Sequence, residues 1–457
     1  MTNGNPKQRA SRQTQSWESG STRLGRIGEA ARRDRKVRMN ALLHHLTPEL
    51  LKQSYQRLKK EAASGIDDVT WKEYAEELED RISDLHERIH RGRYRAQPSK
   101  RIYLPKGEGG RRPIGIACLE DKIVQAGLVR ILNEIYEVDF LGYSYGFRPG
   151  RSQHQALDAL YVGVTKQKIN WIVDADLRSF FDRISHVWLI RMLEQRIGDK
   201  RVMRLIRKWL RAGVSEAGEW SETPVGTPQG AVISPLLANV YLHYVLDLWV
   251  QQWRRKASQG EVIYVRYADD FVAGFQYREE AERFLSLLKQ RLEKFDLELN
   301  EEKTRLIEFG RFAQRDRRRR GQRKPETFDF LGLTHICSVS RGTGKYFILR
   351  QPSKKKLRKK LDEIYQHLQR IRHLPIPLQG QWLRSVFQGQ LNYSAVPGSA
   401  ESLATLRKAL AKLWLKALRR RSQKGKRLRW DQFSKIADHW LPKVKIVHPY
   451  PWQRLRV

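Results

Sequence analysis

Two adjacent aspartates at the centre of an apolar stretch constrain the fold of this chain more than any other feature. The segment "EVIYVRYADDFVAGF", residues 261–275, reads as a β-hairpin with Asp269 and Asp270 at its turn. Aspartate commonly forms turns, so the pair could have that role alone. The flanking strands are apolar on both faces, however, which places the turn at the edge of a buried core.

A second apolar strand carries aspartates as well. "WIVDADL", residues 171–177, holds Asp174 and Asp176 among buried neighbours. Carboxylates in buried strands cost solvation energy unless a cation or a donor meets them. Mg²⁺ prefers such hard oxygen ligands, and two such ions about 4 Å apart can activate a hydroxyl and stabilise a leaving pyrophosphate. The two strands together indicate a nucleotidyl-transfer centre.

The net charge of the chain indicates which class of partner it binds. The chain has 457 residues with 88 Lys+Arg against 50 Asp+Glu, which leaves a formal charge of +38. Counterion release makes such an excess favourable for a polyphosphate partner. A cationic surface kept for solubility is the alternative, but an excess of this size fits nucleic acid better.

The sequence argues against several other classes of protein. The only cysteines, Cys118 and Cys337, are isolated, so neither a zinc finger nor a disulfide framework is expected. No apolar run is long enough to span a bilayer, and the first 25 residues lack the apolar core of a signal peptide. These observations predict a cytoplasmic protein without a membrane partner.

Two Gly-rich turns are candidates for holding a nucleotide. The predicted hairpin over 99–117 has a basic, Gly-rich tip with Lys106 and Arg112, where the backbone could approach phosphate oxygens. An ordinary solvated turn would look similar. In "GTPQGAVISPLL" the glycines and proline fix a bend from which Gln229 projects, either for a backbone hydrogen bond or for contact with nucleic acid or nucleotide.

The remainder of the chain divides by composition. Residues 1–40 are polar and basic and are expected to be disordered, and the Arg-rich stretch 311–326 is expected to be a loop. Helices dense in Lys and Arg are predicted at 353–373, 377–393 and 401–421, with tryptophans mostly in their core and cations facing nucleic acid. The tail 441–457 should be extended and basic.

Five stretches carry a family resemblance. In chain order they are "YSYGFRPGRSQHQAL", "DADLRSFFD", "GTPQGAVISPLLANVYLHYVLD", "RYADDFV" and "FDFLGLTHI". They closely resemble, in order and spacing, the successive motifs of bacterial group II intron reverse transcriptases, also called maturases. The likeness runs from about residue 40 to the C-terminus.

The resemblance implies an α+β right-hand polymerase. Fingers and palm, an antiparallel sheet with helices, would occupy residues 41–335. An all-α thumb with the X (maturase) region would occupy residues 336–440, followed by the tail.

The resemblance also implies roles for individual residues. Asp174, Asp269 and Asp270 would hold two Mg²⁺ ions, for which Mn²⁺ could substitute, with the main-chain carbonyl of Ala175 as a further ligand. Asp176 and Asp182 are expected to hold local structure. Lys106 and Arg112 would contact the triphosphate, and Gln229 would line the nucleotide pocket. Phe180 would be an aromatic gate against a 2′-hydroxyl, and Lys303 could approach the primer or the nucleotide.

Some of these roles have plain alternatives. Phe180 could pack in the core, since Phe181 lies beside it, and Lys303 could pair with a glutamate. A viral-type RNA-dependent RNA polymerase is disfavoured because Ala268 stands where glycine is usual and because Phe180 is bulky.

The function expected from the resemblance is RNA-directed DNA synthesis by an intron-encoded enzyme. Its partners would be an RNA template, a DNA or RNA primer, dNTPs, target DNA and the group II intron RNA, whose splicing it would assist. A host-adopted relative in DNA repair or phage defence, and a splicing-only maturase, remain alternatives. The sequence leaves open whether the protein is a monomer or a dimer.

Overall fold

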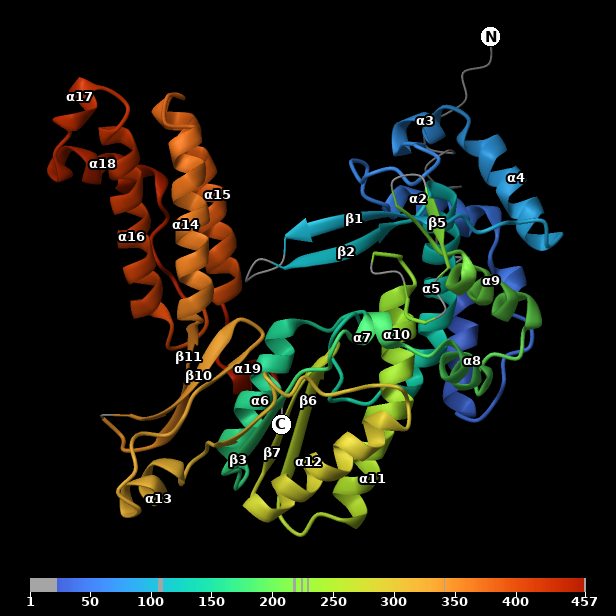
Figure 1. The fold of residues 1–457 in the computed structure, drawn as a ribbon, viewed down its shortest axis with the longest axis horizontal. Helices are drawn as coiled ribbons and strands as arrows, with labels where there is room; N and C mark the ends of the chain where they lie inside the picture. The colour runs from blue at the N-terminus through green and yellow to red at the C-terminus, as the bar shows by residue number, and fades with distance from the viewer. Residues whose placement is uncertain are drawn as a thin grey trace, which may run out of the picture.

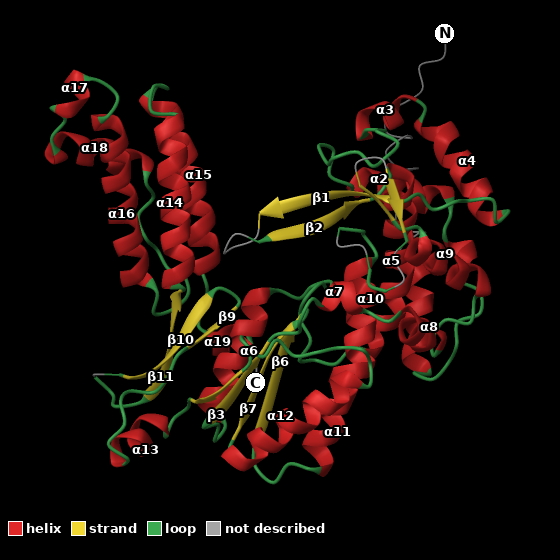
Figure 2. Cartoon of the chain, in the orientation of Figure 1, coloured by secondary structure: helices red, strands yellow, loops and turns green. Residues whose placement is uncertain are grey.

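The computed structural model describes residues 23–105, 110–216, 219–222, 225–227, 230–340 and 342–455. Within these residues the chain forms three parts (Figures 1 and 2). A palm with the central sheet lies at the bottom of the view, fingers rise on one side of it, and a bundle of helices forms a thumb on the other. In the described part of the chain, no helix is both long and apolar enough to cross a membrane.

The palm is built on an antiparallel sheet in the order β6-β7-β3-β8. Helix α6 covers one face, against Ile172 and Val272, while α12 and the α10–η3–α11 helix cover the other, against Val173 and Phe271. The strand and helix bounds are β3 (Trp171–Ala175), β6 (Val262–Tyr267), β7 (Asp270–Phe275), β8 (Arg305–Glu308), α6 (Gln153–Lys166), α7 (Phe180–Arg183), α10 (Ser234–Leu242), η3 (His243–Asp247), α11 (Leu248–Lys256), α12 (Arg278–Glu293) and α13 (Ala313–Arg319).

The fingers combine a second sheet, β2-β1-β4-β5, with helices that share the large palm core. The β1–β2 hairpin extends from this sheet toward the thumb (Figure 1). The elements are η1 (Leu43–His45), α2 (Pro48–Arg57), α3 (Trp71–Glu76), α4 (Leu78–His90), β1 (Ser99–Pro105), β2 (Arg111–Ile116), α5 (Leu119–Asp139), α8 (His186–Glu194), α9 (Lys200–Arg211), β4 (Val214–Glu216) and β5 (Glu219–Ser221).

The thumb has a hydrophobic core of its own, centred on the fully buried Trp414. A small antiparallel sheet, β11-β10-β9, joins it to the palm. The elements of this sheet and of the thumb are β9 (Phe328–Phe330), β10 (Leu333–Val339), β11 (Tyr346–Pro352), α14 (Lys354–Arg370), α15 (Ile376–Ser394), α16 (Ala400–Arg419), α17 (Gln423–Lys426) and α18 (Trp430–Trp440), and the chain ends with α19 (Pro451–Arg454).

The structure differs from the sequence-based expectation at both ends of the chain. Residues 23–33 are helical rather than disordered, because Leu24, Ile27 and Ala31 recur on one helical face and are buried. The tail is not wholly extended: α19 packs on α6, where Arg454 reaches the buried Asp158 at 2.9 Å.

Two internal segments differ as well. The cationic stretch 311–326 contains helix α13, in which Arg317 and, just beyond its end, Arg320 pair with Glu308 of β8. The segment 336–440 begins with strand, since β10 and β11 precede the first thumb helix at Lys354. The helices expected at 353–373, 377–393 and 401–421 are confirmed as α14, α15 and α16.

Candidate active site

The aspartate pair lies at a two-residue turn between β6 and β7. Tyr267 and Asp270 are the last paired residues of the hairpin, so Ala268 and Asp269 form the turn itself. Ala268 adopts a left-handed conformation with φ +57°, which L-residues other than glycine rarely take. Such strain persists only where the surroundings fix it, and it is common at functional sites.

Strand register decides which aspartate of β3 meets this turn. Asp174 pairs with Val272 and Ala175 with Phe271, so Asp176 follows opposite Asp270. Side chains opposite one another on antiparallel strands share a face of the sheet. Asp176 and Asp270 are therefore neighbours, while Asp174 lies two pairs further from the turn.

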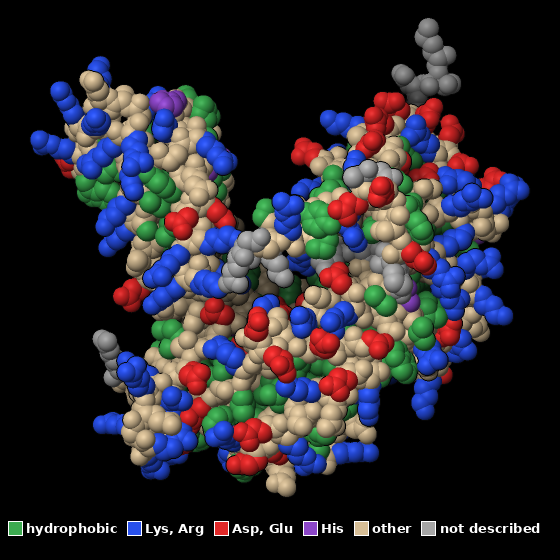
Figure 3. Space-filling view, viewed as in Figure 1, with side chains coloured by type: hydrophobic (Ala, Val, Ile, Leu, Met, Phe, Trp, Pro, Cys, Tyr) green, Lys and Arg blue, Asp and Glu red, His purple; other side chains and the backbone are tan. Residues whose placement is uncertain are grey.

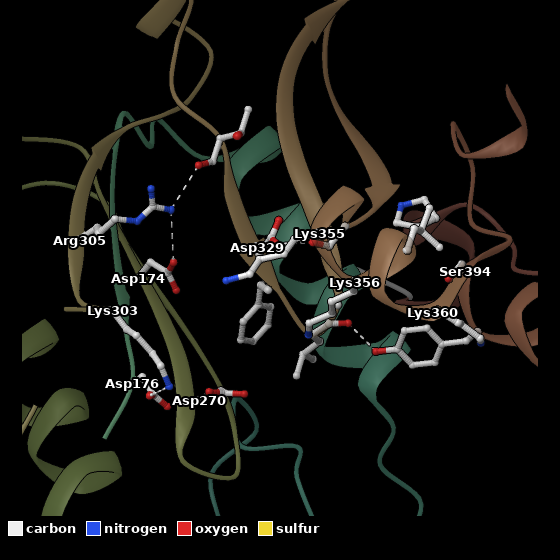
Figure 4. A pocket seen from close by; sticks show the side chains of 18 of the residues that line it. Asp174, Asp176, Asp270, Lys303, Arg305, Asp329, Lys355, Lys356, Lys360 and Ser394 are labelled. Atoms are coloured by element: carbon white, nitrogen blue, oxygen red, sulfur yellow. Dashed lines mark hydrogen bonds and ion pairs between the residues drawn. The ribbon is translucent and has the colours of Figure 1, made fainter. Parts of the chain in front are cut away.

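Asp174 instead faces the opposite neighbour, β8. It pairs in register with Arg305, and Arg305 Nη2 lies 3.8 Å from Asp174 Oδ2. Figure 4 shows Asp174 directed toward Arg305, whereas Asp176 and Asp270 lie together beside Lys303. The structure thus places Asp176, which the sequence analysis assigned to local structure, where it had expected Asp174.

Lys303 supplies the positive charge next to this carboxylate cluster. Its Nζ lies 2.7 Å from Asp176 Oδ2, so it pairs with an aspartate rather than with a glutamate. The hydrogen bond to Asp176 and the charges of Asp176, Asp270 and Asp269 raise the pKa of Lys303, against the effect of partial burial. In the protein alone, this ammonium offsets part of the clustered negative charge.

The pKa values of the nearby carboxyl groups remain raised even with Lys303 beside them. Burial, followed by the charges of Asp269 and Asp176, raises the pKa of Asp270 to about 7. Burial also raises the pKa of Asp269 and, to about 6, that of Asp174. A cation bound to ionised carboxylates would remove this penalty.

The donor chemistry of Asp176, Asp269 and Asp270 fits a hard divalent cation, since all three offer carboxylate oxygens. In the described part of the chain, no three Asp, Glu, His or Cys side chains converge closely enough to hold a metal as they stand. Asp176 accepts a hydrogen bond from Lys303 Nζ at 2.7 Å. The set fits a metal once that ammonium is displaced.

A cavity of about 1080 Å³ separates these carboxylates from the base of the thumb. Figure 3 shows the molecule hollowed between thumb and fingers, with Lys and Arg side chains along the thumb. Figure 4 shows the palm carboxylates on one side of the cavity and lysines of α14 on the other. The polar side chains lining it include Asp174, Asp176, Asp270, Lys303, Arg305, Asp329, Lys355, Lys356, Lys360, Gln390 and Tyr393. A polyanion would find cations on the thumb side.

The residues expected to hold the nucleotide are described in part. Lys106 and Gln229 lie outside the described residues. Arg112 is exposed on β2. Burial raises the pKa of Asp269, and the charge of Arg112 offsets part of that rise, so its guanidinium is within electrostatic reach of the turn. On either side of Gln229, Gly226 packs against the main chain of Phe181 and Gly230 against that of Gly115.

Phe180, the residue expected to act as an aromatic gate, lies in the core. Phe180 is 2% exposed and packs in the core against Tyr241. Phe181 is half-buried and meets the exposed Phe147 edge to face at 6.5 Å. Phe147 has φ +57°, a second strained residue beside the site that the sequence analysis did not single out. Of the two adjacent phenylalanines, Phe181 has the more exposed ring.

The thumb tryptophans divide between core and surface. Trp414 is fully buried and donates its indole N–H to Gln379 Oε1 at 2.9 Å, while Trp382 stacks on His367. Trp430 is 44% exposed at the start of α18. The expectation of mostly core tryptophans is therefore confirmed for two of these three.

Clustered aspartates on a palm sheet, opposite a lysine-lined thumb, define a template-directed nucleic-acid polymerase. Comparison with known families agrees: the model for reverse transcriptase (RNA-dependent DNA polymerase) matches residues 104–335. The chain belongs to the reverse transcriptase family. Enzymes of this family use divalent metal ions and have nucleic acid as partner.

Individual relatives extend the comparison. The chain is similar to protein YkfC of Escherichia coli, 34% identical over 52% of this chain and 71% of YkfC. It is similar to the group II intron-encoded protein LtrA of Lactococcus lactis, 38% identical over 46% of this chain and 35% of LtrA. The nuclear intron maturase 2 of Arabidopsis thaliana is 30% identical over 29% of this chain and 23% of that protein.

Proposed function

We propose that this protein is an RNA-directed DNA polymerase that adds dNTPs to a primer 3′-hydroxyl at the site formed by Asp176, Asp269 and Asp270. The observation that carries the proposal is the register of β3 and β7, which sets Asp176 opposite Asp270 at a strained turn facing the cavity. Carboxylates gathered around one turn, with Asp176 opposite Asp270, serve no packing purpose and cost solvation energy. The assembled set also disfavours a splicing-only maturase.

The same carboxylates would hold two Mg²⁺ ions, with Asp174 left to its contact with Arg305. Such a pair of ions lowers the pKa of the attacking hydroxyl and stabilises the leaving pyrophosphate. The family resemblance implied the main-chain carbonyl of Ala175 as a further ligand beside Asp174. In this proposal Leu177, which follows Asp176, takes that place.

Cationic side chains would handle the triphosphate. Lys303 pairs with Asp176 in the protein alone and would turn toward the nucleotide once that carboxylate binds metal. Arg112 approaches from the fingers, and Lys106 directly follows β1 in the sequence. Charge-assisted contacts of this kind position phosphates in line with the hydroxyl. Phe181 would contact the sugar and exclude a 2′-hydroxyl.

The larger biological role we propose is that of an intron-encoded maturase. LtrA is named as a group II intron-encoded protein, and the Arabidopsis relative as an intron maturase. The lysine-rich face of α14 and the formal charge of +38 suit binding of a folded intron RNA and of target DNA beside the template and primer. This activity would take place in the bacterial cytoplasm.

Primer extension on an RNA template tests the polymerase directly. With Mg²⁺ and dNTPs the wild-type protein should extend a DNA primer, and with rNTPs it should extend poorly. The D269A/D270A variant should bind the template–primer but not extend it. Absence of dNTP incorporation by wild type, or synthesis by the double variant, would refute the proposal.

A further inference from the structure

The catalytic turn is held from behind by a buried arginine. Arg266 lies two residues before Ala268 on β6, on the face of the hairpin opposite Asp270, and is fully buried. Its Nη1 donates to the main-chain oxygen of Ala268 at 2.9 Å. The carbonyl of the strained residue is thus fixed by a side chain that does not face the cavity.

Every arm of this guanidinium has a partner. Nε and Nη2 donate to the two carboxylate oxygens of Asp247 at 2.7 and 2.5 Å. Nη1 also donates to Asn239 Oδ1 at 3.1 Å, and Nη2 to Ser144 Oγ at 2.7 Å. The planar fork of arginine suits such a bidentate arrangement, which a lysine cannot reproduce.

The network joins the β6–β7 turn to two other parts of the chain, the continuous α10–η3 helix and the segment around Ser144. Asp247 ends the π-helical turn η3, Asn239 lies on α10, and Ser144 precedes the glycine that packs against the turn. Asn239 also donates a hydrogen bond to the main-chain oxygen of Gly146 at 2.7 Å, which connects the helix to this segment. A π-turn inside a helix is uncommon and is often found at functional sites.

Stability alone does not account for this ion pair. Both side chains of the Arg266–Asp247 pair are 0% exposed. Replacing a buried pair by apolar residues of similar size is often neutral or stabilising, because desolvation of two charges offsets their attraction. What apolar residues would not replace is the donor to the Ala268 carbonyl. The role of Arg266 in holding the Ala268 carbonyl is therefore distinct from any contribution of the ion pair to stability.

We infer that Arg266, held in place by Asp247, is a positioning residue that sets the turn and thereby the geometry with which Asp269 and Asp270 receive metal. The inference rests on the proposed function and adds a residue outside the metal-binding set. Loss of the Ala268 contact should let the turn relax from its strained conformation. Metal affinity and the rate of nucleotide incorporation should then fall together, while affinity for template–primer should not.

Two variants of the full chain separate positioning from folding. Arg266→Lys keeps the charge but loses the fork, and R266M/D247L removes both buried charges and the turn contact. The control is Arg196→Lys: Arg196 is also buried, pairs with Asp139 at 2.8 Å and donates to the main-chain oxygen of Val37 at 2.9 Å, all away from the turn. Thermal unfolding ranks the stability of all three against wild type.

The readouts are Mn²⁺ binding by EPR titration without nucleotide, and single-turnover incorporation of one dNTP across a Mg²⁺ titration. In both Arg266 variants, Mn²⁺ should bind several-fold more weakly and the rate should fall about 10–100-fold, the scale for small misplacement of reacting groups. The Kd for template–primer should stay within about two-fold, and Arg196→Lys should match wild type in both readouts.

Failure of the inference and failure of the proposed function look different. If wild type binds Mn²⁺ but incorporates no dNTP, the polymerase proposal fails, and the EPR titration still decides the role of Arg266. If either folded Arg266 variant binds Mn²⁺ and incorporates dNTP as wild type does, Arg266 does not position the turn. An equal loss in Arg196→Lys would likewise overturn the inference, because any buried pair would then have the same effect.

Discussion

Gly146 packs directly against Ala268 of the β6–β7 turn: a Cβ added at Gly146 would lie 2.3 Å from the main-chain nitrogen of Ala268. The glycine of the "YGFRPG" stretch is thus required by the close approach of two backbones. The approach links this segment to the turn that carries Asp269 and Asp270. It also gives the first testable consequence.

Gly146→Ala should displace the turn, because the atom it meets is backbone and cannot rotate away. We expect the rate of dNTP incorporation to fall about 10-fold or more, with about 1–3 kcal/mol lost from the free energy of unfolding. Gly142→Ala is the matched control, since a Cβ there meets nothing within 4 Å. Equal activity of the two variants would contradict the packing argument.

The two neighbouring phenylalanines should respond differently to truncation. Phe181→Ala should leave stability nearly unchanged and increase incorporation of rNTPs relative to dNTPs, because the half-buried ring is removed from the sugar. Phe180→Ala should cost about 3–5 kcal/mol of stability through the cavity it leaves, without changing sugar discrimination. Competition between dNTP and rNTP in single-nucleotide extension measures the ratio. A change in selectivity with Phe180→Ala alone would return the gate to Phe180.

A buried histidine in the palm should make the protein sensitive to acid. Burial, opposed by Asp247 and aided by nearby Arg266 and Arg148, lowers the pKa of His243 to about 4. The folded pKa is below the unfolded value of about 6.5, so the unfolded state takes up the proton first. The contribution of neutral His243 to stability should be complete above pH 6.5 and fall by about 3 kcal/mol as the pH drops to 4.

Urea unfolding of wild type and His243→Asn across this range isolates the effect, because asparagine does not titrate. The difference in unfolding free energy between the two proteins should change between pH 6.5 and 4 and be constant above. A difference that is the same at pH 7.5 and pH 4.5 would show that His243 is not neutral in the fold for this reason.

The sequence was sufficient for the parts of the fold that follow from local pattern. The hairpin around Asp269, the strand beginning at Trp171 and the long thumb helices have clear periodicity, and each is present. The basic Arg-rich stretch and the N-terminal segment were misjudged, because charge density obscured the short apolar faces that fold them. Leu24, Ile27 and Ala31 were the available signal.

The choice between Asp174 and Asp176 shows a deeper limit. Both side chains point to the same face of β3, since they are two residues apart, and alternation cannot tell them apart. Only the pairing with β7 sets Asp176 opposite Asp270 and Asp174 opposite Val272. For the same reason, the sequence alone does not tell which of the adjacent Phe180 and Phe181 is buried. The Arg266–Asp247 contact is also invisible locally, because the pair is joined only by tertiary packing.

The measurement that tests the account most directly compares Asp176→Asn with Asp174→Asn in single-turnover dNTP incorporation on an RNA template. Both changes preserve shape and remove one charge, and both side chains are 20% exposed. The register predicts that Asp176→Asn abolishes incorporation, a loss of about 10³-fold or more, while Asp174→Asn stays within about 10-fold of wild type. Loss of synthesis in Asp174→Asn together with near-normal synthesis in Asp176→Asn would contradict the site proposed for this polymerase.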